Sequence, residues 1–87
     1  MKMDSYISSL SYDARFDTLY ILFTANNHSY GEEDQSGIII MRDIQDDSLT
    51  GYTIMHFRKK LGDNYPFNEY LPVPIDFAQD VIPRIFS

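Results

Sequence analysis

Short strand-type segments separated by short polar turns fill the first two thirds of this sequence, and they constrain the fold more than any other feature. Alternating or continuous apolar residues predict strands at about 5–11, 18–24, 37–44 and 52–59. The turns "DARFD" and "QDDSLT" are short enough to join antiparallel neighbours as hairpins. The sequence therefore predicts an α+β fold, with a four-stranded antiparallel β-meander and a short C-terminal helix.

The remaining segments predict connections and that one helix. The polar stretch "ANNHSYGEEDQS" favours a longer loop, either mobile or extending the hairpin. The stretch "GDNYPFNEYLPVP" carries three of the four prolines and favours an irregular crossing segment. The last dozen residues space their apolar side chains at roughly helical intervals, so we expect about two helical turns that end before Pro83.

The size and composition indicate a single small globular domain, residues 1–87. An 87-residue chain has a small core, and seven Tyr and six Phe are typical of a folded domain. The residues that we expect in this core are Leu19, Ile21, Phe23, Ile39 and Ile54. Apolar residues on both sides of the strands at 37–44 and 52–59 leave one sheet face for a second subunit, a partner or the chain's own loops. We expect a homodimer, since symmetric dimers are the commonest oligomers.

The charge balance points to the kind of partner. Thirteen acidic against seven basic side chains give a net charge of -6, which disfavours nucleic acid and anionic lipid and favours a basic protein. The basic run at 58–60 is typical of a solvated strand end, with a small nucleic-acid contact as the alternative. No segment has the pattern of a signal peptide or a membrane span, so we expect a cytoplasmic protein without a membrane partner.

A pair of aspartates precedes the second expected strand and has two interpretations. Asp13 and Asp17 flank the first turn, where a short carboxylate accepts hydrogen bonds from backbone N–H groups and shapes a hairpin. Alternatively, Tyr12, Asp13 and Asp17 together form a ligand or metal site, although their spacing matches no specific motif.

These residues also carry a family resemblance. The motif Y-D-x-x-x-D-x-L-Y-I, from Tyr12 to Ile21, resembles the opening signature of the short bacterial domain of unknown function family twenty-two eighty-three. The later "GIIIMRDIQDDSLTGYTIMHF" is similar to the second hairpin of that family. The chain departs from the family pattern at Ala14, where a proline is common, at Thr53, where a glutamate is common, and in a longer tail beyond Lys60. The resemblance implies a small antiparallel β domain of bacterial or phage origin and an antitoxin-like or inhibitor-like role, without a catalytic residue.

No pattern of catalytic or metal-binding residues stands out, so we expect neither an enzyme nor a cofactor. Without cysteine, the chain has no thiolate zinc site and no cysteine nucleophile. The stretch "DDSLTG" lacks the acidic twelfth residue of a calcium loop, and His28 and His56 lack the spacing of a metal-binding pair.

We therefore predict a non-enzymatic, acidic protein-interaction module. Acidic residues steer a basic partner, while aromatic side chains on surface loops anchor it. The predicted contact residues are Glu32, Glu33, Asp34, Tyr30, Tyr65 and Phe67.

Overall fold

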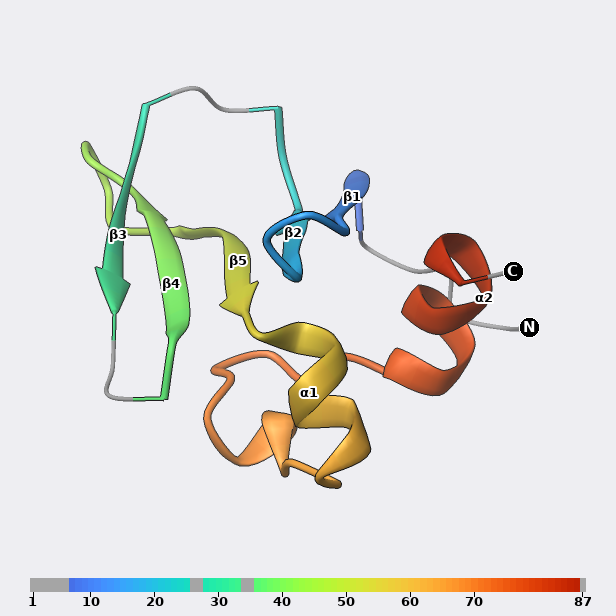
Figure 1. Cartoon of the computed structure of the whole chain (residues 1–87). Coiled ribbons are helices and arrows are strands. Elements are labelled where there is room, and N and C mark those ends of the chain that lie inside the picture. Colours follow the sequence, from blue (N-terminus) through green and yellow to red (C-terminus); the bar gives the residue numbers. More distant parts are fainter. Residues whose placement is uncertain (1–6, 26–27, 34–35, 87) are drawn as a thin grey trace.

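A five-stranded antiparallel sheet forms the centre of the computed structural model, which describes residues 7–25, 28–33 and 36–86 (Figure 1). The strands lie in the order β1-β2-β5-β4-β3. Their bounds are β1 Ser9–Asp13, β2 Thr18–Leu22, β3 Ser29–Glu33, β4 Ile38–Asp43 and β5 Leu49–Met55. The expected α+β class, the antiparallel sheet and the two hairpins are confirmed.

The sheet differs from the expected four-stranded meander in its strand count and its order. The stretch expected as a loop contains β3, which pairs along β4 from Ser29↔Asp43 to Glu33↔Ile39. The last strand, β5, then returns between β4 and β2. Consequently β1 and β3 are the two edges of the sheet, and the mostly apolar β2, β4 and β5 lie inside it.

The strand expected at 52–59 ends early, because the chain turns sharply at His56. This residue has a left-handed backbone, with φ of 56°, and it directly precedes helix α1, Phe57–Gly62. The basic residues expected at a strand end therefore belong to a helix.

The C-terminal third continues in three short helical segments. A 3₁₀ turn, η1 (Phe67–Glu69), is followed by a π turn, η2 (Phe77–Val81), and by helix α2 (Ile82–Ile85). The expectation that Pro83 ends the helix is wrong, because Pro83 lies in the first turn of α2. A proline is tolerated there, since the N–H that it lacks would have no partner within the helix.

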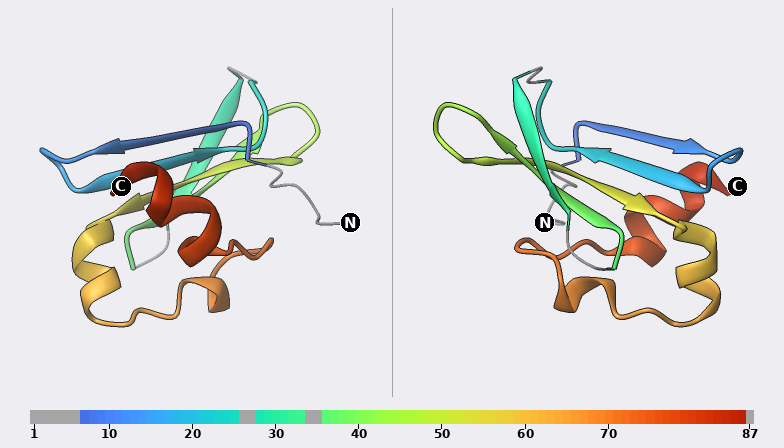
Figure 2. Two further views of the ribbon diagram at one scale, coloured as in Figure 1. Left: turned by 90° about the vertical axis from the view of Figure 1, so that its right-hand side faces the viewer. Right: turned by 60° about the vertical axis from the view of Figure 1, so that its left-hand side comes forward.

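All of these helical segments lie on one face of the sheet (Figure 2). The core forms between the helical segments and the side chains that β2, β4 and β5 direct toward those segments. Leu19, Ile21 and Ile54, which the sequence predicts as core residues, are fully buried there. Tyr52 fixes this packing, because its hydroxyl donates to the Val73 carbonyl and accepts from the Val73 N–H, both at 2.8 Å. The fully buried side chains are Leu19, Ile21, Ile38, Tyr52, Ile54, Phe57 and Val81.

Candidate functional site

Asp13 shapes the first hairpin turn, as the first of the two interpretations of the sequence predicts. The Asp13 carboxylate accepts hydrogen bonds from the backbone N–H groups of Arg15 at 2.9 Å and Phe16 at 3.4 Å. Both groups belong to the turn that Asp13 starts, so this carboxylate acts on its own loop.

Asp17 acts on a distant element instead. Its carboxylate accepts hydrogen bonds from the Tyr12 hydroxyl at 2.6 Å and from the N–H groups of Arg58 at 2.8 Å and Lys59 at 3.4 Å. The last two donors belong to the first turn of α1, whose own N-cap residue, His56, provides no side-chain cap. Asp17 therefore supplies the cap that α1 lacks.

The hydrogen bonds of Asp17 also determine its ionisation. Burial raises the pKa of the Asp17 carboxyl, but the hydrogen bonds from Tyr12, Arg58 and Lys59 outweigh it and bring the pKa below its ordinary value. Hydrogen bonding to the same carboxylate is the main cause that raises the pKa of the Tyr12 hydroxyl. The Tyr12, Asp13 and Asp17 side chains thus have structural partners in this fold.

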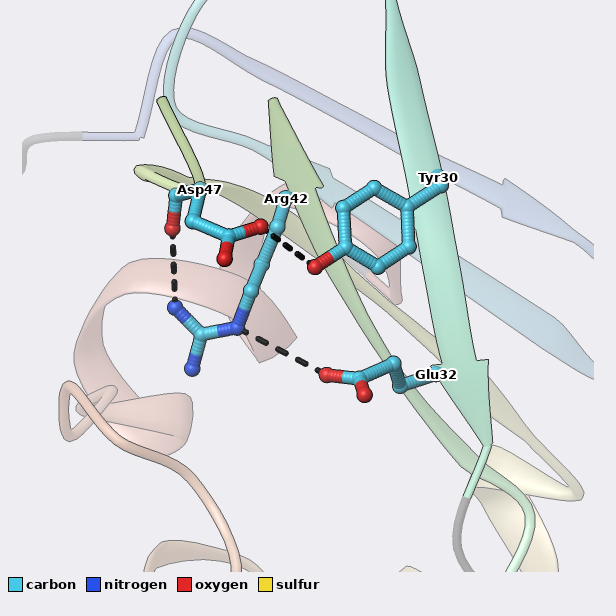
Figure 3. Close-up of polar contacts among 4 residues, drawn as sticks. All are labelled: Tyr30, Glu32, Arg42 and Asp47. Atoms are coloured by element: carbon cyan, nitrogen blue, oxygen red, sulfur yellow. Dashed lines mark hydrogen bonds and ion pairs between the residues drawn. The ribbon is translucent and has the colours of Figure 1, made fainter. Parts of the chain in front are cut away.

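The edge at β3 carries a cluster that contains two of the predicted contact residues (Figure 3). Tyr30 donates its hydroxyl to the Asp47 carboxylate, and the Arg42 guanidinium donates to the Asp47 carbonyl at 3.1 Å. Arg42 also lies 3.8 Å from a Glu32 carboxylate oxygen. The hydrogen bond with Asp47 is the main cause that raises the pKa of Tyr30. This cluster ties β3 to β4 and to the β4–β5 turn.

The other predicted contact residues are dispersed. Glu33 is exposed on β3, and Asp34 lies outside the described residues. Tyr65 is half-buried, with its ring 5.4 Å from that of Phe67. The expectation that Phe67 is a surface anchor is wrong, because it is only 5% exposed and packs against Phe57 and Phe77 in the core.

A more continuous surface lies on the sheet face opposite the helices (Figure 2). We call it the open face. Strand register places its side chains together, since Tyr20 and Ile39 both pair with Thr53, while Thr18 pairs with Met55. Tyr20 is 41% and Leu22 37% exposed, which is high for side chains of a central strand. The side chains that define the open face are Tyr20, Leu22, Ile39, Met41, Thr53 and Met55.

Two glycines bring the apolar side chains of the open face close to the backbone. A Cβ at Gly51 would lie 3.1 Å from a Leu22 methyl carbon and only 2.2 Å from the Ile21 carbonyl oxygen. A Cβ at Gly31 would lie 2.6 Å from an Ile39 methyl carbon. The glycines therefore let the neighbouring strands and side chains approach more closely than a larger residue would permit.

Carboxylates mark both edges of the open face. Glu33 pairs with Ile39 on one edge strand, and Asp13 pairs with Thr18 on the other, so both residues share this face. Glu32, which pairs with Ile40, is on the helix-covered face instead. The open face thus has an apolar centre between two acidic edges, an arrangement that depends on strand register.

A metal site and a membrane-spanning helix are both missing from the described part of the chain. Among residues 7–25, 28–33 and 36–86, no three His, Cys, Asp or Glu side chains gather in a way that could hold a metal ion. Within those same ranges, no helix has the length and apolar character needed to cross a membrane. In comparisons with known proteins, no family model, no curated protein and no solved structure matches the chain.

Proposed function

We propose that this chain is a non-enzymatic interaction module that binds a basic protein through the open face of its sheet. The observation that carries the proposal is the exposure of Tyr20 and Leu22 on a face that no described helix covers. Contiguous apolar surface of this kind, rimmed by polar residues, is typical of protein-interaction sites. Burial of the apolar centre supplies affinity, and an aromatic side chain such as Tyr20 suits an anchoring role.

The acidic edges support a basic partner. Glu33 and Asp13 flank the apolar centre on a chain whose net charge is -6. Complementary charges at an interface rim speed the encounter and disfavour competitors of the same sign. The family resemblance implies an antitoxin-like or inhibitor-like role for this chain. We therefore propose that its partner is a cytoplasmic protein that such a module would neutralise or regulate.

The alternative is a small-ligand or metal site at Tyr12, Asp13 and Asp17. A ligand there would compete with the hydrogen bonds that Asp13 makes to its turn and that Asp17 makes to α1. Because breaking those contacts costs stability, we place this alternative second.

A parallel capture experiment tests the proposal. The wild-type chain and three variants are immobilised and exposed to the same lysate of the source organism, and the bound proteins are identified by mass spectrometry. Leu22→Asp puts a charge among the apolar side chains of the open face, and Glu33→Lys reverses the charge at its edge. Glu69→Lys makes the same change of charge on η1, which lies in the helical layer.

We expect a protein of high isoelectric point that binds to the wild type and to Glu69→Lys but is lost with Leu22→Asp and reduced with Glu33→Lys. A protein retained equally by all four chains would contradict the open face as the binding site. A bound metal or metabolite that is lost on replacement of Asp13 or Asp17 would favour the alternative.

A further inference from the structure

Tyr20 is the one aromatic residue among the side chains that define the open face, and it stands on an inner strand of the sheet. Its directly paired neighbours are Ser11 on β1 and Thr53 on β5, which both have small side chains. Because neither neighbour is large enough to cover the ring, Tyr20 is 41% exposed. The ring therefore offers a flat contact surface to a partner.

Other aromatic rings of this chain already carry a guanidinium. The guanidinium carbon of Arg58 lies 4.7 Å from the centre of the Phe86 ring, and that of Arg15 lies 5.5 Å from the centre of the Phe16 ring. In the part of the chain that the structure describes, no ring stacks on Tyr20 and no cation lies over it. The face of the Tyr20 ring is thus left for a cation from another molecule.

A carboxylate lies next to this ring on the neighbouring strand. Asp13 follows Ser11 by two residues on β1, so it shares the open face and is the diagonal neighbour of Tyr20. Diagonal neighbours of an antiparallel pair are about 7–8 Å apart, a distance that one long side chain can span. The hydrogen bonds that shape the first turn both use the Oδ1 atom of Asp13. Within the described residues, Oδ2 forms no hydrogen bond, so it can accept one from a ligand without opening the turn.

A ring beside a carboxylate oxygen matches a guanidinium group in particular. Because the guanidinium is planar, it can lie flat on the ring while the N–H groups at its edge donate to the carboxylate. The exposed Ser11 hydroxyl, between Tyr20 and Asp13 in the register, can accept a further N–H. An ammonium is a compact point charge and fits this combination less well. The arrangement therefore favours arginine over lysine.

We propose that Tyr20 and Asp13 form an arginine-recognition site on the open face, with the guanidinium on the Tyr20 ring and its N–H groups donating to Asp13 Oδ2. The inference rests on the proposed function, because it names the side chain by which the basic partner is recognised. Leu22 lies on the other side of Tyr20 from Asp13, so it stays available for the apolar part of the contact.

An NMR titration of the ¹⁵N-labelled chain tests this proposal without the partner. The probe is the peptide Gly-Arg-Gly, capped at both ends. In the first comparison peptide citrulline replaces arginine, which keeps the shape but removes the charge, and in the second lysine replaces it. We expect the arginine peptide to shift the amide signals of Ser11 and Tyr20 along a saturable curve. The citrulline peptide should bind at least about five-fold more weakly and the lysine peptide about two-fold or more, since they lose or weaken an exposed cation–π contact and an ion pair.

Two variants remove one half of the site each. Tyr20→Leu keeps an apolar side chain but removes the ring, and we expect it to weaken binding of the arginine peptide about three-fold or more. Asp13→Asn keeps an oxygen that can accept the hydrogen bonds of the turn but removes the charge, and we expect a loss of about two-fold or more.

Each variant has a matched control. Asp43→Asn makes the same change in the second hairpin turn, which a carboxylate shapes in the same way at the opposite end of the sheet. Tyr70→Leu removes a ring that is 47% exposed but lies outside the sheet. Both controls should bind the arginine peptide as the wild type does.

Three outcomes would overturn the proposal: no saturable shifts around Tyr20, equal affinity for the arginine peptide and either comparison peptide, or unchanged affinity in both Tyr20→Leu and Asp13→Asn. If a variant fails to fold, the wild-type comparison of the three peptides decides by itself. Failure of the arginine site leaves the proposed function standing when Leu22→Asp still loses the captured basic protein. A bound arginine peptide, together with a captured protein that Leu22→Asp retains, would instead refute the proposed function and keep the arginine site.

Discussion

Asp17 caps helix α1 from a position 41 residues earlier in the chain, with its carboxylate 2.8 Å from the backbone nitrogen of Arg58. The two residues belong to different layers, because Asp17 ends the first hairpin turn whereas Arg58 lies in the first turn of the helix that leaves the sheet. The Asp17 backbone also takes part, since its carbonyl accepts from the Phe57 N–H at 2.9 Å. This contact joins the start of the sheet to the helical layer that covers the core.

Removing this cap should destabilise the fold. Asp17→Ala leaves the first N–H groups of α1 without their carboxylate partner, and it puts a less suitable residue at a left-handed φ of 52°. We expect a loss of about 1–2 kcal/mol in the free energy of unfolding, measured by urea denaturation. Asp17→Asn keeps one accepting oxygen and tolerates the left-handed backbone, so it should lose less. Equal losses for the two variants would argue against the capping role.

The same carboxylate should make stability depend on pH in the acid range. The folded-state pKa of Asp17 lies below the ordinary value of 3.8 for this side chain, so the unfolded chain binds more protons in the window between the two values. Its contribution is therefore fully present above about pH 5 and is lost as the pH falls through the folded-state pKa. Urea midpoints from pH 7 down to pH 2 should show this loss. The difference in urea midpoint between wild type and Asp17→Asn isolates the contribution of Asp17 from that of the other carboxylates. If the two curves of midpoint against pH ran parallel, the assignment to Asp17 would be contradicted.

Two neighbouring isoleucines on β4 should respond very differently to the same change. Ile38 is fully buried, so Ile38→Asp should unfold the domain, because an unpaired buried charge costs several kcal/mol. Ile39 lies half-buried on the open face, and Ile39→Asp should leave a folded chain. Circular dichroism and thermal unfolding measure both. Unfolding of both variants to the same degree would show that the open face is covered in the free protein.

The sequence indicated the apolar character of β4 but not which of its residues face the core. Four consecutive apolar residues, 38–41, carry no alternation, so their pattern cannot separate the two faces. Our expectation that Ile39 is a core residue is wrong for this reason, and Ile38 takes that place. Only the pairing of Ile38 with Ile54 settles the register.

Other differences arise from contacts between distant residues. The β3 sequence S-Y-G-E-E is too polar to predict a strand, yet it forms one because β4 provides a partner for its backbone. The end of β5 at Met55 has no proline or glycine to indicate it, and the cap from Asp17 favours a helix there instead. The acidic residue Glu33 was predicted as a contact residue, but its place on the open face depends on a strand that the sequence did not predict.

The homodimer expected from the sequence stays a prediction, and in this fold a second copy would use the open face. Both copies would bring acidic edges to the contact, so self-association should strengthen as salt screens the repulsion. Light scattering at rising salt should then move from the mass of one 10.2 kDa chain toward twice that value. Leu22→Asp should remain a monomer throughout. A dimer that persists in Leu22→Asp would place the interface elsewhere.

The most direct test of the open face is the affinity of the captured basic partner for wild type and Leu22→Asp, with Glu69→Lys as the control, measured at low and high salt. Replacing an apolar residue at the centre of an interface by a charge should cost at least about 2 kcal/mol, which is roughly a thirty-fold rise in Kd. Association with the wild type should also slow as salt rises, because the acidic edges steer the encounter. The account predicts a large loss for Leu22→Asp, little change for Glu69→Lys and a salt-dependent association rate. An unchanged Kd for a folded Leu22→Asp chain would contradict it.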